Sequence, residues 1–156
     1  MLNASRLELL TRFTAPDAYV PLLEKHPKLR VCLAHFGGAG DWTSYLDRPC
    51  HSGMDDSTKS WLAKIADMLR DGRYPNLQTD ISYTLFANDE HLYLLKVLLC
   101  DPRISSRVLF GSDFYVVENA EAEERRRSVR LRALLGDELV KTIAQDNPNE
   151  YLGTTP

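Results

Sequence analysis

The sequence predicts a single α/β domain in which parallel strands alternate with helices. Three short, mostly apolar segments are separated by longer segments of helical period. Such alternation implies parallel strands joined through helical crossovers. The chain has 156 residues, about the length of one domain. With 44% hydrophobic and 26% charged residues it has an ordinary globular composition. We therefore expect residues 1–156 to form one domain, neither a disordered tail nor a disulfide-stabilised miniprotein.

The first half of the chain combines helical periodicity with one strand signal. Residues 5–13 and 16–25 carry leucines at helical spacing and begin with cap-like residues. Residues 30–35 are mostly apolar and end in glycines, which predicts a buried strand. Residues 37–56 contain scattered Gly, Pro, Asp and Ser without a steady period. We expect a long loop there, in which residues 42–46 could form one helical turn.

The second half repeats the helix–strand pattern. It opens with an amphipathic segment whose apolar residues share one face and whose end is followed by a glycine. A Pro-Asn break precedes the next strand, and Asp-Pro and Asn-Pro pairs predict the ends of later helices. The expected helices cover residues 57–70, 89–99, 118–135 and 137–145, and the expected strands cover residues 77–83 and 107–113.

Charge and cysteine content narrow the class of protein. The formal net charge is −3, which argues against nucleic acid and anionic membranes as partners. The most apolar segment, residues 92–100, is interrupted by Lys96 and is far shorter than the ~20 residues of a membrane span. The three cysteines include no CxxC pair, and charges near the N-terminus stand where a signal peptide needs apolar residues. We therefore expect a soluble, cytoplasmic protein with reduced thiols.

Residues 121–132 contain five arginines, which raises the question of RNA binding. Glu121 precedes Arg125 and Glu123 precedes Arg127 by four residues, the order that stabilises a helix. No aromatic residues are interleaved with the arginines. The pattern favours a solvated or partner-facing helix over a nucleic-acid interface.

Polar residues follow each of the three expected strands, where parallel α/β folds collect functional groups. A histidine and a carboxylate at neighbouring strand ends can begin a metal or acid–base site. A histidine held by structural hydrogen bonds, or an aspartate that caps the next helix, would explain the same residues without function. In chain order, the strand ends carry His35-Phe36-Gly37-Gly38, then Asp80, Ser82 and Tyr83, then Gly111-Ser112-Asp113-Phe114.

Five further residues have a structural interpretation beside a functional one. Asp80 could hydrogen-bond a site residue or cap the loop after its strand. Trp42 follows the glycines closely enough to contact a substrate, but it could equally be a core or interface residue, as could Trp61. His26 and His91 are expected at the surface or as capping residues.

Four segments, in the right order, resemble the amidohydrolase superfamily, most closely its amidohydrolase-related branch of metal-dependent hydrolases and decarboxylases. KLRVCLAHFGG, YPNLQTDIS and RVLFGSDF are similar to strands six, seven and eight of that family, and DNPNEYLG is similar to its closing helix. The resemblance covers roughly residues 16–153, and HFGG combined with LFGSDF makes it fairly specific.

The resemblance implies a distorted (β/α)8 barrel with its active site at the carboxyl ends of the strands. It implies that Asp113 is a metal ligand and proton shuttle, and that His35 lies beside the metal and polarises the substrate or orients the attacking hydroxide. The implied cofactor is a divalent metal, with zinc expected, which can lower the pKa of a bound water to about 7. The expected substrate contacts are Phe36, Gly37, Gly38, Trp42 and Ser112.

The sequence departs from the family pattern in its metal ligands. No two histidines are two residues apart, so the His-x-His pair of strand one is absent, and the strand-five histidine would precede the first helix. Asp113 alone cannot hold a zinc ion, which takes three or four protein ligands. We therefore expect the C-terminal portion of a TIM-like barrel, about three βα units, in which a homo-oligomer or a completing chain covers the open edges.

Three functions remain open. The first is metal-dependent hydrolysis of a C–N or C–O bond in a small molecule through a metal-activated water. The second is metal-dependent, non-oxidative decarboxylation of an aromatic or enoic acid. The third is a non-catalytic remnant or interaction module that lacks the His-x-His half of the metal site.

Overall fold

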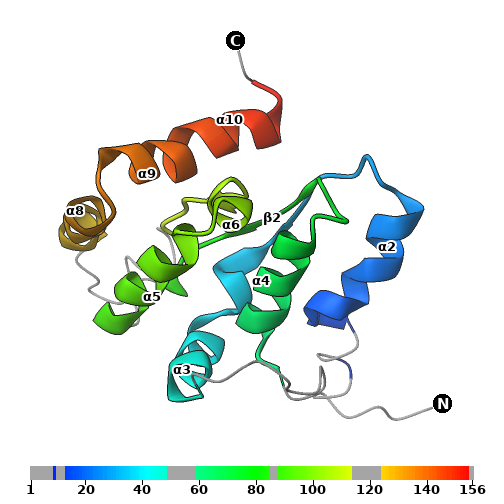
Figure 1. Ribbon diagram of the computed structural model, residues 1–156, viewed down its shortest axis with the longest axis horizontal. Coiled ribbons are helices and arrows are strands. Elements are labelled where there is room, and N and C mark those ends of the chain that lie inside the picture. Colours follow the sequence, from blue (N-terminus) through cyan, green and yellow to red (C-terminus); the bar gives the residue numbers. More distant parts are fainter. Residues whose placement is uncertain (1–8, 10–12, 49–58, 85–87, 114–123, 155–156) are drawn as a thin grey trace.

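The computed structural model describes residues 9, 13–48, 59–84, 88–113 and 124–154 as a helical layer around a small sheet (Figure 1). The elements of the first half are η1 (Pro16–Tyr19), α2 (Val20–Lys25), β1 (Val31–Leu33), η2 (Ala34–Gly37), α3 (Ala39–Asp47), α4 (Trp61–Asp71) and β2 (Leu77–Asp80). Those of the second half are α5 (Asp89–Leu99), α6 (Pro102–Ser105), β3 (Val108–Leu109), α8 (Glu124–Leu135), α9 (Asp137–Lys141), η5 (Thr142–Asp146) and α10 (Asn147–Leu152).

The described strands form one parallel sheet in the order β1-β2-β3. Val31 pairs with Leu77, and Thr79 pairs with Val108. The alternation of strands and helices and the parallel pairing confirm the α/β class that the sequence predicts. Closure into a (β/α)8 barrel stays a prediction.

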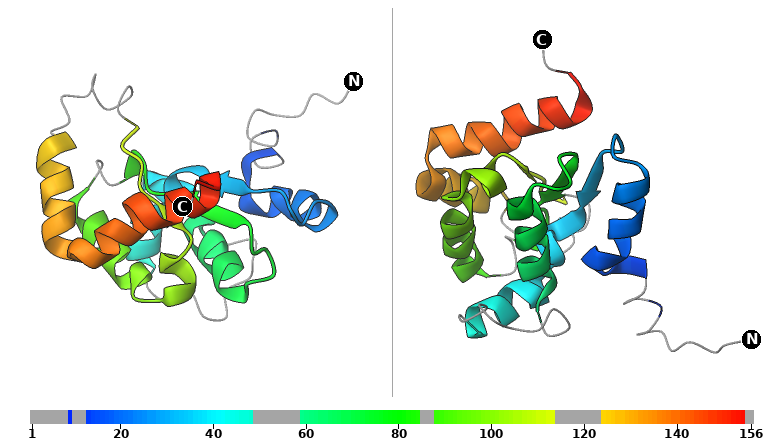
Figure 2. Two further views of the ribbon diagram at one scale, coloured as in Figure 1. Left: turned by 90° about the horizontal axis from the view of Figure 1, so that it is seen from above. Right: turned by 45° about the vertical axis from the view of Figure 1, so that its right-hand side comes forward.

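The two faces of the sheet differ in burial. Leu33, Leu77, Thr79, Ile81 and Val108 share the face that α4, α5 and α6 cover, and each is at most 7% exposed. Figure 2 shows these helices together on one side of the strands. Side chains of a strand alternate between its faces, so Cys32, Gln78, Asp80 and Leu109 belong to the opposite face. All of these except Gln78 are only partly buried.

Helix α4 (Trp61–Asp71) corresponds to the expected helix 57–70 but begins later than expected, after Ser60. Ser60 caps its first turn by accepting a hydrogen bond from the backbone N–H of Ala63 (3.2 Å), and Gly72 ends it in a left-handed conformation. Leu62, Ile65 and Leu69 fall on its buried face and are at most 2% exposed. The amphipathic spacing therefore corresponds to real burial against the sheet.

Two sequence expectations about helices are wrong, and a third, about the Asp-Pro pair, is confirmed but incomplete. Within the expected loop 37–56, residues 39–47 form α3, a nine-residue helix rather than one turn. Full burial of the Trp42 side chain compensates for the poor helix propensity of this segment. The Asp-Pro pair ends α5 but also begins α6, since Asp101 accepts a hydrogen bond from the backbone N–H of Arg103 (3.1 Å). The Asn-Pro pair does not end the last helix, because η5 leads directly into α10, where Pro148 occupies a first-turn position.

His91 is also placed differently from the expectation. It lies in the first turn of α5 with its side chain 1% exposed, rather than at the surface. Its Nδ1 lies 3.0 Å from the carbonyl oxygen of Thr84, and its Nε2 lies 3.4 Å from Oγ1 of Thr43. Two polar partners make the burial of the imidazole tolerable.

The arginine-rich segment forms α8 from residue 124 onward. Arg130 forms an ion pair with Asp89 of α5 (2.7 Å), and Arg127 contacts the same carboxylate (3.5 Å). The expected partners Glu121 and Glu123 lie outside the described residues, as do most of the expected helix 5–13 and the start of the helix 118–135.

Across the residues that the structure describes, no helix is long and apolar enough to cross a membrane.

Candidate functional site

The end of β1 turns sharply at His35. His35 and Phe36 adopt positive φ angles of 62° and 46°, and the backbone N–H of His35 donates to Oδ1 of Asp80 (3.1 Å). A left-handed conformation costs a residue with a Cβ atom roughly 1–2 kcal/mol, so other contacts must hold this turn. The strand is shorter than expected because the turn begins one residue after Leu33.

Asp80, the last residue of β2, supplies much of that support. Besides the His35 amide, its carboxylate accepts hydrogen bonds from the backbone N–H of Ser82 (3.0 Å) and from the Ser82 hydroxyl. Its Oδ2 lies 3.7 Å from Sγ of Cys32. Asp80 thus fulfils both roles suggested by the sequence, because it holds a predicted site residue and also caps the loop after its own strand.

Ser82 fixes the ring of His35. The His35 Nδ1 lies 3.0 Å from the carbonyl oxygen of Ser82 and 3.0 Å from its Oγ. A carbonyl oxygen only accepts, so we assign the proton of the neutral ring to Nδ1. The Nε2 atom then carries the lone pair, and it has no hydrogen-bond partner among the described residues. The His35 side chain is 40% exposed, so Nε2 is accessible.

The end of β3 packs against the same serine. A Cβ atom at Gly111 would lie 3.1 Å from Cβ of Ser82, a tight contact, so a glycine at this position lets the chain pass close to Ser82 as it leaves β3. Asp113 follows in a left-handed conformation with φ 56°. Because β2 separates β1 from β3, their ends lie about 10 Å apart, two strand spacings. His35 lies two residues beyond β1 and Asp113 lies four residues beyond β3, so both follow the carboxyl ends of the outer strands, while Ser82 follows the central strand β2.

Strained backbone is concentrated at this edge. Among the described residues, the non-glycine residues with positive φ are His35, Phe36, Tyr83 and Asp113, and all four follow strand ends. Such conformations persist where surrounding contacts enforce them, and they gather at functional sites. Tyr83 is 43% exposed, with its ring edge-on to His35 at a centroid distance of 6.3 Å. The sequence placed Tyr83 after the second strand but gave no reason to expect its contact with His35.

A cavity of about 310 Å³ lies beside β1. His35, Gly37 and Gly38 line it together with Cys32 and Trp61, so it joins the end of β1 to the first turn of α4. The sequence grouped the first three of these as site residues. The structure brings them to one hollow, next to the accessible imidazole.

The other expected substrate contacts lie elsewhere. Phe36 and Trp42 have fully buried side chains, packed edge to face with their ring centroids 5.8 Å apart. The indole N–H of Trp42 donates to the carbonyl oxygen of Phe36 (3.0 Å), so this pair supports the turn from within the core. Ser112 lies at the end of β3, outside the lining of this cavity.

A buried polar network continues below the turn. Thr84 donates from Oγ1 to the carbonyl oxygen of His35 (2.8 Å), and its own carbonyl oxygen lies 3.0 Å from Nδ1 of His91. The His91 ring also packs against Trp42 at a centroid distance of 5.6 Å. The strained turn at His35 therefore rests on α3 and α5, through contacts that local sequence patterns do not reveal.

The described residues do not by themselves fit a metal ion. They contain no group of three or more His, Cys, Asp or Glu side chains placed to hold one. Burial and the nearby Asp80 carboxylate raise the pKa of Cys32 to about 12, so its thiol is neutral at pH 7 in the metal-free protein. His35 through Nε2 and Asp113 through its carboxylate are the two donors available at the strand ends.

Comparison with known proteins agrees with the strand-end motifs. The sequence matches the family model described as Amidohydrolase over residues 7–154. Comparisons with the curated proteins and with the solved structures give no match. The family match spans nearly the whole chain and includes both His35 and Asp113. On this evidence, the chain belongs to the amidohydrolase family.

Proposed function

We propose that this chain carries the strand-six-to-eight part of a metal-dependent hydrolase site that cleaves a C–N or C–O bond of a small molecule. The observation that supports it most directly is the His35 ring, which is held at Nδ1 and left accessible at Nε2 beside a cavity. A purely structural histidine would satisfy both nitrogens, as His91 does.

In this proposal His35 binds and polarises the substrate. With its proton on Nδ1, the neutral ring offers a lone pair at Nε2 that can accept a hydrogen bond or a proton from the reacting group. When it is protonated, the same atom donates to a developing negative charge. The two Ser82 contacts keep the ring in one orientation for both tasks, which limits the reorganisation that the reaction requires.

Asp113 is the proposed proton carrier. Its carboxylate has no hydrogen-bond or ion-pair partner among the described residues, so it is free to accept a proton and to release it to a leaving group. Asp113 follows β3 with a φ of 56°, two residues after Gly111, whose backbone passes close to Ser82. Gly37 and Gly38 line the cavity without side chains and leave room for a substrate.

The proposed cofactor is a divalent metal, zinc in the first instance. When bound, it supplies a Lewis acid and lowers the pKa of a coordinated water. Asp113 would be one ligand, and the others must come from outside the described residues, because those residues offer too few donors.

We also propose that further strands complete the barrel, either from a second copy or from another chain. Parallel sheets are normally covered on both faces, whereas Cys32, Asp80 and Leu109 on the second face are partly exposed. Gln78, on the same face, buries its Oε1 without a hydrogen-bond partner. A completing layer would bury this face and could supply the missing donor.

Turnover with added metal tests the function. The purified chain would be assayed with Zn²⁺ and with Mn²⁺ on p-nitrophenyl acetate for C–O cleavage and p-nitroacetanilide for C–N cleavage. We expect metal-dependent hydrolysis that falls at least 100-fold in Asp113→Asn and in His35→Asn. Asp137→Asn removes a comparable carboxylate that is 85% exposed on α9, and it serves as the control.

The same assay separates the alternatives. Release of CO₂ from 2,6-dihydroxybenzoate without hydrolysis would replace hydrolysis by decarboxylation. Activity that needs no metal, or that survives Asp113→Asn, would contradict the site assignment. Absence of turnover, together with absence of Zn²⁺ binding by calorimetry, would exclude completion of the site by a second copy and would favour either a different completing chain or the non-catalytic interaction module.

A further inference from the structure

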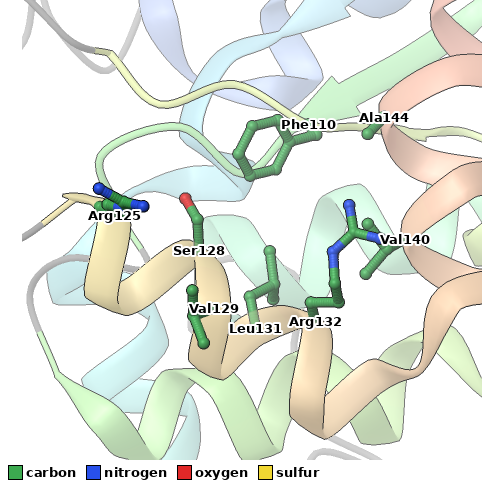
Figure 3. A pocket seen from close by; sticks show the side chains of 8 residues that line it. All are labelled: Phe110, Arg125, Ser128, Val129, Leu131, Arg132, Val140 and Ala144. Atoms are coloured by element: carbon green, nitrogen blue, oxygen red, sulfur yellow. The ribbon is translucent and has the colours of Figure 1, made fainter.

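A second cavity, of about 320 Å³, lies between the end of β3 and the helices α8, α9 and η5 (Figure 3). We call it the α8 pocket. Among the residues that the structure describes, it shares no lining residue with the cavity at His35. Its volume is at the lower end of the range for small-molecule pockets, about 300–1,000 Å³. It is therefore large enough for a ligand the size of one or two aromatic rings.

The α8 pocket is lined by apolar side chains and by a separate group of polar side chains. Phe110, Leu131, Val140 and Ala144 form its apolar part, contributed by the exit of β3, by α8 and by the helices that follow. Polar groups come from α8 alone, as Arg125, Ser128 and Arg132. In Figure 3 the Ser128 hydroxyl points away from the helix on the side of Arg125, Phe110 lies across the pocket, and Arg132 lies farther along the helix. A ligand that fits must combine a polar end with an apolar body.

The two arginines of the α8 pocket are not equivalent. Arg132 forms an ion pair with Asp137 (2.9 Å), which already offsets part of its charge. Within the described parts of the chain, neither Arg125 nor Ser128 has a hydrogen-bond or ion-pair partner. They are three residues apart on α8, so their side chains are neighbours on the helix surface. Together they form a donor pair that complements an anion.

We propose that the α8 pocket binds a small organic acid with an aromatic or branched apolar body. Its carboxylate accepts hydrogen bonds from the Arg125 guanidinium and the Ser128 hydroxyl. Its apolar body lies against Phe110 and Val140 and removes their surface from water. An inorganic phosphate would use the same donors but would leave the apolar lining hydrated. A neutral apolar molecule would cover Arg125 without offering it an acceptor.

The proposal is tested by calorimetric titration of the full chain with 2-naphthoate, with 2-naphthamide as a neutral probe of the same shape. We expect 2-naphthoate to bind at least tenfold more tightly than 2-naphthamide, and Arg125→Gln to weaken it about tenfold. Arg130→Gln is the matched control. It removes the same charge from the same helix, but Arg130 faces Asp89 of α5 and does not line the pocket. Binding by this variant should stay within twofold of the wild type.

A cavity-filling variant tests the apolar part. Ala144 is exposed and lines the pocket from η5, so Ala144→Leu fills the space without a change in the core. It should weaken 2-naphthoate at least fivefold while the far-ultraviolet circular dichroism stays unchanged. Because the two cavities share no residue, His35→Asn should bind 2-naphthoate as the wild type does. The proposal therefore stands or falls independently of the hydrolase function.

Four results would each overturn this inference. The first is equal binding of 2-naphthoate and 2-naphthamide. The second is wild-type affinity in both Arg125→Gln and Ala144→Leu. The third is an affinity for inorganic phosphate that matches that of 2-naphthoate, which would identify a simple anion site. The fourth is no measurable binding of 2-naphthoate at about 10 mM, a concentration at which even a millimolar site is mostly occupied.

Discussion

Replacement of Gly37 by alanine should destabilise the protein by more than its strained backbone alone explains. Gly37 has φ +92°, and a Cβ atom there would lie 2.7 Å from the backbone N of Leu62. That distance is about 0.7 Å shorter than the shortest ordinary contact of 3.4 Å, so the two atoms would repel each other strongly. The first turn of α4 cannot easily retreat, because Asp41 accepts a hydrogen bond from the Trp61 amide (2.6 Å) and Leu62 is fully buried.

Two neighbouring glycines separate the contributions. Gly38 has the same φ of +92° with nothing within 4 Å of its Cβ position, so Gly38→Ala reports the backbone strain alone, about 1–3 kcal/mol. Gly40 lies in α3 with open space around it, so Gly40→Ala should stabilise by about 0.5–1 kcal/mol. We expect Gly37→Ala to lower the free energy of unfolding by about 1–3 kcal/mol more than Gly38→Ala, as overpacking in a rigid site does.

Urea denaturation followed by circular dichroism measures all three variants under one set of conditions. The reasoning is refuted if Gly37→Ala and Gly38→Ala lose the same stability, because the turn would then not pack against α4. It is also refuted if Gly40→Ala is as damaging as the other two. In that case the substitutions would act through a feature that the three glycines share, and not through the contact with Leu62.

Three further predictions concern the supports of the site. Burial and Asp80 raise the pKa of Cys32 to about 12, so its alkylation by iodoacetamide should become about tenfold faster with each pH unit from pH 7 to 10. Asp80→Asn should accelerate this alkylation at every pH. Peptide mass spectrometry measures both rates. Hydrogen bonds from Arg103 and Arg70 lower the pKa of Asp101 below its usual range. The contribution of its carboxylate to the free energy of unfolding is therefore present above the unfolded pKa of about 3.9 and is lost as the pH falls through the folded value. Asp101→Ala should cost about 1–2 kcal/mol at pH 7 and clearly less near pH 2, as measured by denaturation at both pH values. His91→Phe should cost about 1–3 kcal/mol in the same measurement, because it leaves the buried Thr84 carbonyl oxygen without its partner, and an unchanged midpoint would show that this bond contributes nothing.

The fold class could be predicted from the sequence because hydrophobic periodicity and helix-breaking residues determine helices and strands within short segments of the chain. The expected helix 89–99 coincides with α5, and the three strands appear in the expected order. The lengths of the strands could not be predicted in this way. β1 stops where His35 turns to meet Asp80, 45 residues later in the chain, and β2 stops where Asp80 binds Ser82. Long-range hydrogen bonds, and not propensity, set these ends.

The same distinction applies to the buried aromatic residues. Two glycines and scattered polar residues made the segment after His35 look like a loop, yet one tryptophan, buried beside Phe36 and His91, organises it into α3. His91 was expected at the surface or as a capping residue, but it is buried. Its burial depends on Trp42 and Thr84, neither of which belongs to its own helix.

The sequence could indicate those candidate-site residues that follow the ends of strands. His35 and Asp113 follow the strands where the motifs place them, and both have positive φ angles. The sequence could not indicate that Ser82, 47 residues from His35, holds the imidazole through both its carbonyl and its hydroxyl oxygen. That geometry depends on the pairing of β1 with β2, which fixes the offset between two distant segments.

This arrangement has a consequence for how the proposed site is assembled. The orientation of His35 depends on Asp80, the last residue of β2, and on Ser82 and Thr84 in the turn that follows this strand. None of these contacts needs a metal or a further strand. The strained turn and the accessible Nε2 are therefore organised before any completing layer arrives. Such a layer has to bring only the remaining metal ligands and a cover for Gln78, so assembly of the proposed barrel would complete a site that is already oriented.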